Sequence, residues 1–400
     1  MALRLYVTVF AKSIEDSRLT YLLAAALAAM MGFVAILFRR RLTPQDFLYK
    51  LASRFSRPAG SLKAVVRDAP YRRVKDSSAP EHRPTLLNLV TSDGSGQACH
   101  PDVVHIPEGF GAERWTYWMA CTPYPSMDSA QENPEIFASY DGVNWEVPEG
   151  LRNPLVPKPS GSGDHNSDPD LVYWNGELWL FYRETMRSKT PKVTADINTI
   201  RLIKSADGVH WSQPIEVLRD SSGRQVVSPA VIHDGQAFRM WTVEVERGAL
   251  RLVRRSSADG VRWGEAELTT IAGLEAERQP WHIDVVRERD RLSAILVSCT
   301  GLGGAGSRIH YAFSEDGGRN WQAGGYLLPL AYEFESKLQY RASLRPSGET
   351  GTEYEIWYSA ASLSDMFSIA YLRMARAGNT LVPCTANGER RLAAAKAAAG

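Results

Sequence analysis

The chain has 400 residues, of which 44% are hydrophobic and 23% are charged. This composition, with 11 Trp and 16 Tyr, is typical of a folded protein with a large apolar core. The formal net charge of +1 leaves no broad excess of Lys and Arg to neutralise phosphates, which argues against a nucleic-acid-binding protein. The four cysteines lack metal-binding spacing, so we expect buried thiols, with a disulfide between Cys99 and Cys121 as the alternative.

An uncharged segment of 20 residues, Leu19 to Phe38, dominates the N-terminal region. At 1.5 Å per residue a helix of this length is about 30 Å long, which matches the apolar core of a bilayer. Three arginines follow the segment where a cleaved signal would have small residues, so we predict an uncleaved transmembrane anchor within residues 1–41. Positive charge is denser after the segment than before it, which favours a cytoplasmic location for the rest of the chain.

Residues 42–81 are predicted to form a basic juxtamembrane helix followed by a linker. The helix would place apolar residues on one face and basic residues on the other, namely Phe47, Leu48, Leu51 and Phe55 against Lys50, Arg54 and Arg57. Two interpretations stay open, because such a helix can lie on anionic lipid headgroups or pack under the following domain. At the other end of the chain, residues 384–400 are low in complexity and are predicted to be a flexible tail.

A short motif recurs five times in residues 82–383. Each copy opens with a polar or charged residue, enters an apolar run, turns at a Gly or a charged pair and continues through a second apolar run, which is the pattern of a β-hairpin. The first residues of the copies are His100, Asp168, Ser228, His282 and Arg341, and they are separated by 68, 60, 54 and 59 positions. A period in this range indicates a repeat architecture.

A second motif, Ser-x-Asp-Gly followed by Trp, accompanies the first four copies and begins at Ser139, Ser205, Ser257 and Ser314. Asp-Gly between apolar runs is a strong hairpin signal, so each unit holds two hairpins, or four strands. Five such units predict an all-β fold, a five-bladed β-propeller preceded by the N-terminal transmembrane helix. The fifth unit lacks the second motif, and we expect Thr85 to Val90 to supply its outer strand and close the ring.

Polar residues gather at the strand ends that should converge on one face of this propeller. In a propeller the first strand of each blade lines the channel and the second strand returns to the face where the first began. The strand openings and second-strand ends carry His100, Asp102, Asp168, Asp170, Ser228, His282, Asp284 and Arg341, then Thr122, Tyr124, Arg183, Glu184, Glu244 and Ser359, with Glu132 and Asn133 opening a third strand on the same side. Paired donors, acceptors and aromatic rings around a funnel are typical of a sugar-binding site.

The strand-opening Asp-Pro followed by an apolar hairpin, within five repeats, resembles the five-bladed propeller glycoside hydrolases of the arabinanase and β-xylosidase type, to which invertases and levansucrases are related. The resemblance covers the repeats and not the N-terminal segments. It implies a base or nucleophile Asp opening the first blade, a second Asp opening the second blade, and a Glu in the third blade as proton donor. It also implies a central His that helps to hold a metal ion or a water.

Asp168, in Ser167-Asp168-Pro169, matches the second of these positions. The chain departs from the pattern elsewhere, since His100 opens the first blade with Asp102 two residues later, and Val227-Ser228-Pro229 stands where Glu-x-Pro is implied. If the chain is a glycosidase, which needs two carboxyl groups astride the bond, the acid must then be Glu184 or Glu244. We therefore assign catalysis to Asp168, Glu184, Glu244 and Asp102. Substrate binding is assigned to His100, Asp170, His282, Asp284, Arg183, Arg341 and Tyr124.

Each assignment has a structural alternative. Asp168 and Asp170 can cap strand ends through Asx turns, and both histidines can be satisfied core residues. Glu184 can form an ion pair with its neighbour Arg183. Arg341 can bind a substrate carboxylate or neutralise the aspartates around it.

The sequence thus predicts a membrane-anchored, glycoside hydrolase-like enzyme that acts on a polysaccharide or glycan. A carbohydrate-binding propeller without catalysis is the alternative, as is a phosphorylase or transglycosidase that uses Arg183 and Arg341 at a phosphate. A protein-interaction scaffold would carry apolar residues where this chain has charged ones. No cofactor is certain; His282 is the candidate metal ligand, and Ca²⁺ or ordered water is the candidate occupant of the channel. The expected partners are a glycan and, through the anchor, membrane lipid, and the oligomeric state stays open. The membrane side also stays open, because the charge distribution favours the cytoplasmic side and a glycan substrate favours the extracytoplasmic side.

Overall fold

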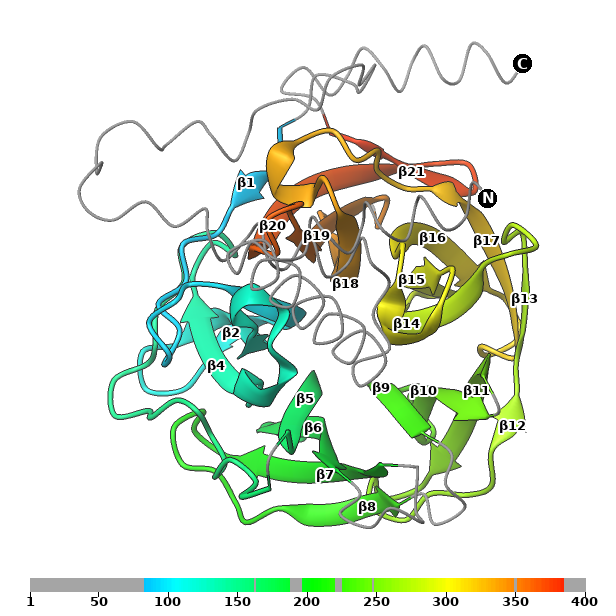
Figure 1. Cartoon of the computed structure of the whole chain (residues 1–400). Helices are drawn as coiled ribbons and strands as arrows, with labels where there is room; N and C mark the ends of the chain where they lie inside the picture. Colours follow the sequence, from blue (N-terminus) through cyan, green and yellow to red (C-terminus); the bar gives the residue numbers. More distant parts are fainter. Residues whose placement is uncertain are drawn as a thin grey trace, which may run out of the picture. The chain divides into compact units, whose positions relative to one another are not determined.

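A computed structural model of the chain describes residues 83–161, 163–187, 196–219, 225–246, 248–348 and 351–384. Five sheets are arranged around a common centre, which confirms the predicted all-β five-bladed propeller (Figure 1). The prediction of four strands is wrong for blade one, whose sheet has three strands among the described residues and only an isolated bridge between Ala138 and Glu146 at its outer edge. The predicted transmembrane helix, the basic helix and the tail beyond Cys384 lie outside the described residues. Within the described ranges, no helix is both long enough and apolar enough to span a bilayer.

The strands of each blade follow one another in chain order, and the first strands of neighbouring blades contact each other around the ring. Blade one is β2 (Ala98–Phe110), β3 (Trp115–Pro123) and β4 (Glu135–Ser139), with the short helices η2 (Pro125–Met127) and η3 (Ser129–Gln131) before β4. Blade two is β5 (His165–Trp174), β6 (Glu177–Met186), β7 (Ile197–Ser205) and β8 (Ile215–Arg219), and blade three is β9 (Gln225–His233), β10 (Phe238–Glu246), β11 (Ala249–Ser257) and β12 (Glu267–Leu268). Blade four is β14 (Gln279–Arg287), β15 (Leu292–Cys299), β16 (Arg308–Ser314) and β17 (Asn320–Tyr326), with η4 (Leu302–Gly304) and the parallel edge strand β13 (Thr270–Ala272), and blade five is β18 (Leu338–Ser347), β19 (Glu353–Ala361) and β20 (Phe367–Ala377), preceded by η5 (Glu333–Glu335).

Two short strands share the outer edge of β20 and complete blade five. β1 (Thr85–Leu86) pairs antiparallel with β20 at Tyr371 and Ala370, which confirms that the N-terminal segment supplies an outer strand. β21 (Thr380–Pro383) pairs with the other end of β20, from Ala377 to Met374, and sequence reasoning did not foresee it. The 11 residues of β20 offer enough edge for both strands, so the ring is closed by the start and the end of the propeller together.

The four Asp-Gly-Trp motifs form outer turns with one repeated pattern of hydrogen bonds. In blade one, Asp141 Oδ1 accepts hydrogen bonds from the amides of Val143 (2.9 Å) and Asn144 (2.7 Å), and the indole of Trp145 donates to the carbonyl of Gly142 (3.0 Å). The same indole-to-glycine bond recurs in the other three motifs. The motif is therefore a self-contained turn, as the structural interpretation of its aspartates predicts.

Each of these turns also packs against the neighbouring blade. The motif glycine lies against a buried Trp of the second strand next door, so closely that an added Cβ would approach the Trp ring to between 2.2 and 2.9 Å. The pairs are Trp118 with Gly208, Trp179 with Gly260, Trp241 with Gly318 and Trp357 with Gly142. Four of the five blade contacts thus depend on a glycine where no side chain fits.

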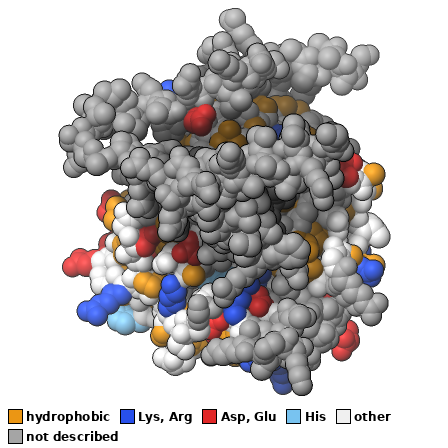
Figure 2. Space-filling view, viewed as in Figure 1, with side chains coloured by type: hydrophobic (Ala, Val, Ile, Leu, Met, Phe, Trp, Pro, Cys, Tyr) orange, Lys and Arg blue, Asp and Glu red, His pale blue; other side chains and the backbone are white. Residues whose placement is uncertain are grey.

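The described cysteines are all free, so the alternative of a disulfide between Cys99 and Cys121 is wrong. Cys99 stands opposite Thr122 in the ladder of β2 and β3, and successive side chains of a strand point to opposite faces. On the surface of the described residues that Figure 2 shows in colour, basic and acidic side chains are interspersed, as expected for a net charge near zero.

Candidate functional site

Three strand openings turn their side chains toward the axis through backbone bulges. His100, Asp168 and Ser228 have φ of 55°, 51° and 57°, in the left-handed region that residues other than glycine seldom adopt. The ladder register shifts beside each of them. Each precedes a Pro, which has no amide hydrogen to give to the ladder, so the interruption loses no hydrogen bond there. Strained backbone held in this way is common at functional sites.

His100, Asp168 and His282, from blades one, two and four, form what we call the imidazole cluster. All three are buried, and each offers a ligand atom within 4.8 Å of the others. Asp168 Oδ1 lies 3.1 Å from His100 Nε2 and 3.7 Å from His282 Nδ1. Its other oxygen, Oδ2, lies 2.8 Å from Nε of Arg183. The strand openings therefore meet as predicted.

The charges of the cluster follow from these contacts. Burial alone would raise the pKa of Asp168, but Arg183 and the two imidazoles outweigh it and hold that pKa well below its usual value, so the carboxyl group is ionised. Burial also lowers the pKa of His282 well below its usual value, so this ring is uncharged near neutral pH. For His100 burial is outweighed by Cys99, Asp168 and Glu132, and the pKa lies well above its usual value.

Glu132 adds a second carboxylate, which sequence reasoning placed on this face without a role. It is 3% exposed, and its Oε2 lies 3.1 Å from Nδ1 of His100, on the far side of the ring from Asp168. The hydroxyl of Thr122 also donates to it, at 3.4 Å. Glu132 lies between η3 and β4, where no strand periodicity indicates which way a side chain points, so the sequence alone could not assign it.

Three atoms of the imidazole cluster are buried without a well-aligned hydrogen-bond partner in the described part of the chain. They are His100 Nε2, Asp168 Oδ1 and His282 Nε2. The 3.1 Å contact between His100 and Asp168 is short enough for an ion pair but is not aligned as a hydrogen bond. Two imidazoles and one carboxylate are a common ligand set of divalent transition-metal ions in enzymes. The residues therefore fit a divalent cation.

Deeper along the axis, Asp102, Asp170 and Asp284 form a separate group, the aspartate cluster, whose ligand atoms also lie within 4.8 Å of one another. One oxygen of each carboxylate accepts a backbone amide of the next blade, from Leu171 (2.6 Å), Val231 (2.9 Å) and Leu344 (2.6 Å) respectively. These bonds tie neighbouring blades together around the axis.

Two guanidinium groups, Arg341 fully buried and Arg345 half-buried, neutralise most of this charge. Arg345 lies 3.1 Å from Asp284 and 3.7 Å from Asp102, and Arg341 lies 3.4 Å from Asp170. Burial, together with the charge of Asp284, raises the pKa of Asp102 to about 6, and burial raises that of Asp170 well above its usual value. Of the two interpretations of Arg341, its contacts fit neutralisation of the aspartates. Catalysis by Asp102, and substrate binding by Asp170 and Asp284, stay predictions.

Glu184 and Glu244 lie outside both clusters. Glu184 forms an ion pair with Arg201 (2.7 Å) on the next strand, and Glu244 forms one with Arg255 (2.5 Å). Arg183 pairs with Asp168 instead of with its neighbour Glu184, because adjacent residues of a strand point to opposite faces. Catalysis by either glutamate stays a prediction. The ring of Tyr124 is centred 6.4 Å from that of His100, at the edge of the site.

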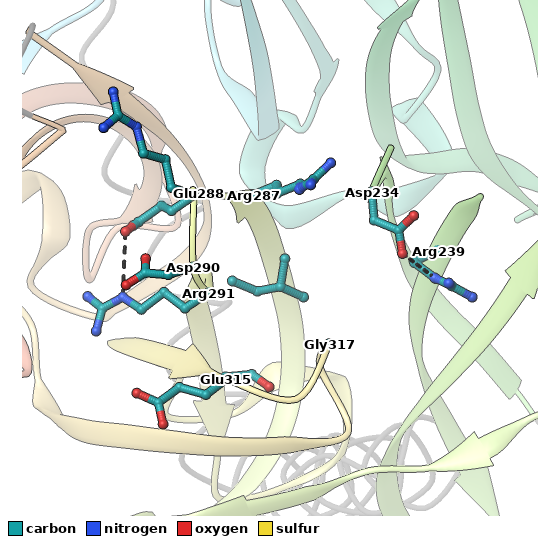
Figure 3. A pocket seen from close by; sticks show the side chains of 11 residues that line it. Asp234, Arg239, Arg287, Glu288, Asp290, Arg291, Glu315 and Gly317 are labelled. Carbon is teal, nitrogen blue, oxygen red and sulfur yellow. Dashed lines mark hydrogen bonds and ion pairs between the residues drawn. The ribbon is translucent and has the colours of Figure 1, made fainter. Parts of the chain in front are cut away.

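A pocket between blades three and four lies at the opposite ends of the channel strands. It is lined by residues of the turns that follow β9 and β14, and two of its ion pairs are drawn in Figure 3. Asp234 binds Arg239 (2.6 Å), and Glu288 lies 3.5 Å from Arg291. Because these charges already neutralise each other, we assign the pocket no role in the site.

Comparison with known proteins relates the chain to carbohydrate-active enzymes. No protein-family profile matches it. It is 32% identical over 315 residues to the A type blood N-acetyl-alpha-D-galactosamine deacetylase of Flavonifractor plautii, an alignment that covers 66% of this chain and 40% of that protein. The chain thus spans less than half the length of this curated relative.

Solved structures agree with this relationship. An N-acetylgalactosamine deacetylase from F. plautii, in complex with blood group B trisaccharide, has a TM-score of 0.65 and 25% identity, and the match covers 74% of this chain and 95% of that one. A thermostable family-43 glycoside hydrolase has a TM-score of 0.53 at 13% identity and shares the fold over 72% of this chain and 93% of its own. The resemblance to the five-bladed propeller glycoside hydrolases is confirmed at the level of the fold, and the relatives described here are a glycoside hydrolase and a carbohydrate deacetylase.

Proposed function

We propose that this chain is a carbohydrate-active hydrolase centred on the imidazole cluster, and that it removes an acyl group from the nitrogen of an amino sugar. The observation that carries the proposal is the convergence of His100, Asp168 and His282, each of which offers a ligand atom within 4.8 Å of the others, with Glu132 beside His100. The 32% identical relative, named as a deacetylase of N-acetylgalactosamine, supports the same reaction class.

Hydrolysis of an amide requires activation of the carbonyl, a base for the attacking water and an acid for the leaving nitrogen. A divalent cation held by His100, Asp168 and His282 would act as a Lewis acid on the acyl oxygen and lower the pKa of a nearby water. Arg183 keeps Asp168 ionised, and burial keeps His282 uncharged, so both present the form that binds cations. His100, whose pKa is raised, would release its proton when the cation binds. Glu132, whose Oε2 lies 3.1 Å from Nδ1 of His100, would take a proton from the water and return it to the sugar nitrogen.

Glycoside hydrolysis is the second candidate, favoured by the position of Asp168. Its ionised carboxylate suits a nucleophile or base, and Glu132, across the ring of His100, would be the acid. Glu184 and Glu244 serve this reaction less well because each already binds an arginine of its own blade.

The test is to incubate the purified full chain with glycosides of N-acetylated amino sugars and to measure released acetate and released sugar separately. We expect acetate without free sugar, loss of the activity after treatment with a chelator, and recovery with Zn²⁺ or Mn²⁺. Free sugar without acetate would establish the glycosidase. If neither acetate nor sugar is released but the chain still binds the glycan, the result would support the alternative of a carbohydrate-binding propeller without catalysis.

We propose in addition that residues 19–38 anchor the enzyme in a membrane, because this run is uncharged, of bilayer length and followed by three arginines. The chain should then stay with membranes after alkaline carbonate extraction, and a variant lacking residues 1–41 should not. Protease protection of sealed vesicles would identify the side on which the propeller lies.

A further inference from the structure

Ser228 opens the channel strand of blade three and lies between two charged or polar partners. Its Oγ is 2.6 Å from Nδ1 of His282 and 2.5 Å from Nη1 of Arg341. The side chain is fully buried, and the residue is held at a φ of 57°. The resemblance to glycosidases implies a glutamate in this Val227-Ser228-Pro229 segment, so a hydroxyl stands where that pattern has a proton donor.

The directions of these two hydrogen bonds follow from their donors. A guanidinium group has only donors, so Ser228 Oγ accepts from Arg341. The oxygen keeps one more lone pair and one hydrogen for His282. If the hydroxyl donated to Nδ1, the proton of the neutral ring would be on Nε2, a buried atom that no described residue accepts from. If Nδ1 donates to the hydroxyl, Nε2 keeps its lone pair for a cation, and the hydrogen of the hydroxyl is then the donor for which no described residue is an acceptor.

Arg341 gives the hydroxyl a fixed support. It is fully buried, and its Nη2 also donates to Asp170 Oδ1 (3.4 Å) and to the carbonyl of Pro229 (3.3 Å). The guanidinium group thus connects the aspartate cluster to Ser228, and Ser228 connects it to His282. Ring orientation and tautomer of a metal-binding histidine are commonly set by the partner of its second nitrogen.

We propose that Ser228 is a positioning residue, which accepts hydrogen bonds from both Arg341 and Nδ1 of His282 and so fixes the ring and the tautomer of His282, leaving the lone pair of Nε2 available to a cation. The inference rests on the proposed function, because it requires a divalent cation at that cluster. It explains the departure in blade three, since the hydroxyl does not transfer a proton to substrate but fixes a ligand.

The test is calorimetric titration of the chelator-treated full chain with Zn²⁺ alone and with Mn²⁺ alone. Ser228→Ala and Ser228→Gly both remove the hydroxyl, and glycine adopts the required φ without strain. Ser293→Ala is the matched control, since it removes another buried hydroxyl. The hydroxyl of Ser293 lies 2.8 Å from that of Tyr311, and neither residue belongs to the site. Visible absorption of the Co²⁺-loaded proteins reports the ligands directly.

We expect the two Ser228 variants to bind either cation about 10- to 100-fold more weakly than the wild type and to show an altered Co²⁺ spectrum. Ser293→Ala should bind like the wild type. Wild-type affinity and spectrum in Ser228→Gly would overturn the positioning role and leave the proposed function standing. A wild-type chain that binds neither cation would instead overturn the cation site on which both depend.

Discussion

Gly208, in the second Asp-Gly-Trp turn, is a sensitive test of how the blades are held together. It has a φ of +81°, and a Cβ added to it would lie 2.2 Å from Cη2 of Trp118 in blade one. In Gly208→Ala the left-handed backbone costs about 1–2 kcal/mol. Overpacking against a rigid buried ring adds about 1–3 kcal/mol. We therefore expect the free energy of unfolding to fall by about 2–5 kcal/mol.

Gly176 provides the matched control. Its φ of +78° is nearly the same, but an added Cβ meets nothing within 4 Å. Gly176→Ala should therefore lose only the backbone contribution, about 1–2 kcal/mol. Urea unfolding of both variants, followed by circular dichroism, measures the difference. Equal losses in the two variants would refute the argument that the glycine is required by its contact with the neighbouring blade.

Three further predictions concern the site and the first blade. Asp168→Asn should abolish both cation binding and turnover while the circular dichroism spectrum is retained; unfolding would instead indicate a structural role. Glu132→Gln should retain cation binding and lower turnover about 10²- to 10⁴-fold, as expected for a residue that transfers a proton, and unchanged turnover would exclude that role. Burial, reinforced by Asp93, raises the pKa of Glu135 to about 7 despite hydrogen bonds from Ser92. Because the folded state then holds the proton more tightly than the unfolded state, stability falls as the pH rises from about 4.5 to about 7. Glu135→Gln should remove this dependence, and at pH 8.5 its free energy of unfolding should exceed that of the wild type by up to about 3 kcal/mol. Parallel pH profiles of the two proteins would contradict the assignment of this dependence to Glu135.

The ring of blades could be predicted because its signals are local. An Asp-Gly turn followed by a Trp specifies a hairpin within a few residues, and the spacing of the copies then sets the number of blades. The closing strand β1 was predicted from a gap in the last repeat. β21 was not, because a strand of four residues at a sheet edge has no pattern that distinguishes it from a tail.

The site was predictable only where the repeat itself places a residue. His100, Asp168 and His282 were identified because they occupy the first position of their copies, and equivalent positions meet at the axis. Partners on other strands were not predictable, since they depend on register. Arg183 and Glu184 are neighbours in sequence, yet Arg183 binds Asp168 and Glu184 binds Arg201. Glu132 was left unassigned because it follows a 3₁₀ turn instead of a strand.

The first and third positions of the repeated motif have different tasks, and this division explains how the fold tolerates change at its centre. The third-position carboxylates, Asp102, Asp170 and Asp284, each accept an amide of the following blade, so the ring depends on them. In the described part of the chain, no first-position side chain accepts a backbone amide of the following blade, and the first positions are occupied by His, Asp, Ser, His and Arg in turn. Chemistry can therefore vary at the first position, while the third-position carboxylates of blades one, two and four tie these blades to the next; Ala230, at the third position of blade three, has no side-chain acceptor. Arg341 is the exception, because it binds a residue of each kind, Ser228 and Asp170, and so couples the geometry of the site to the closure of the ring.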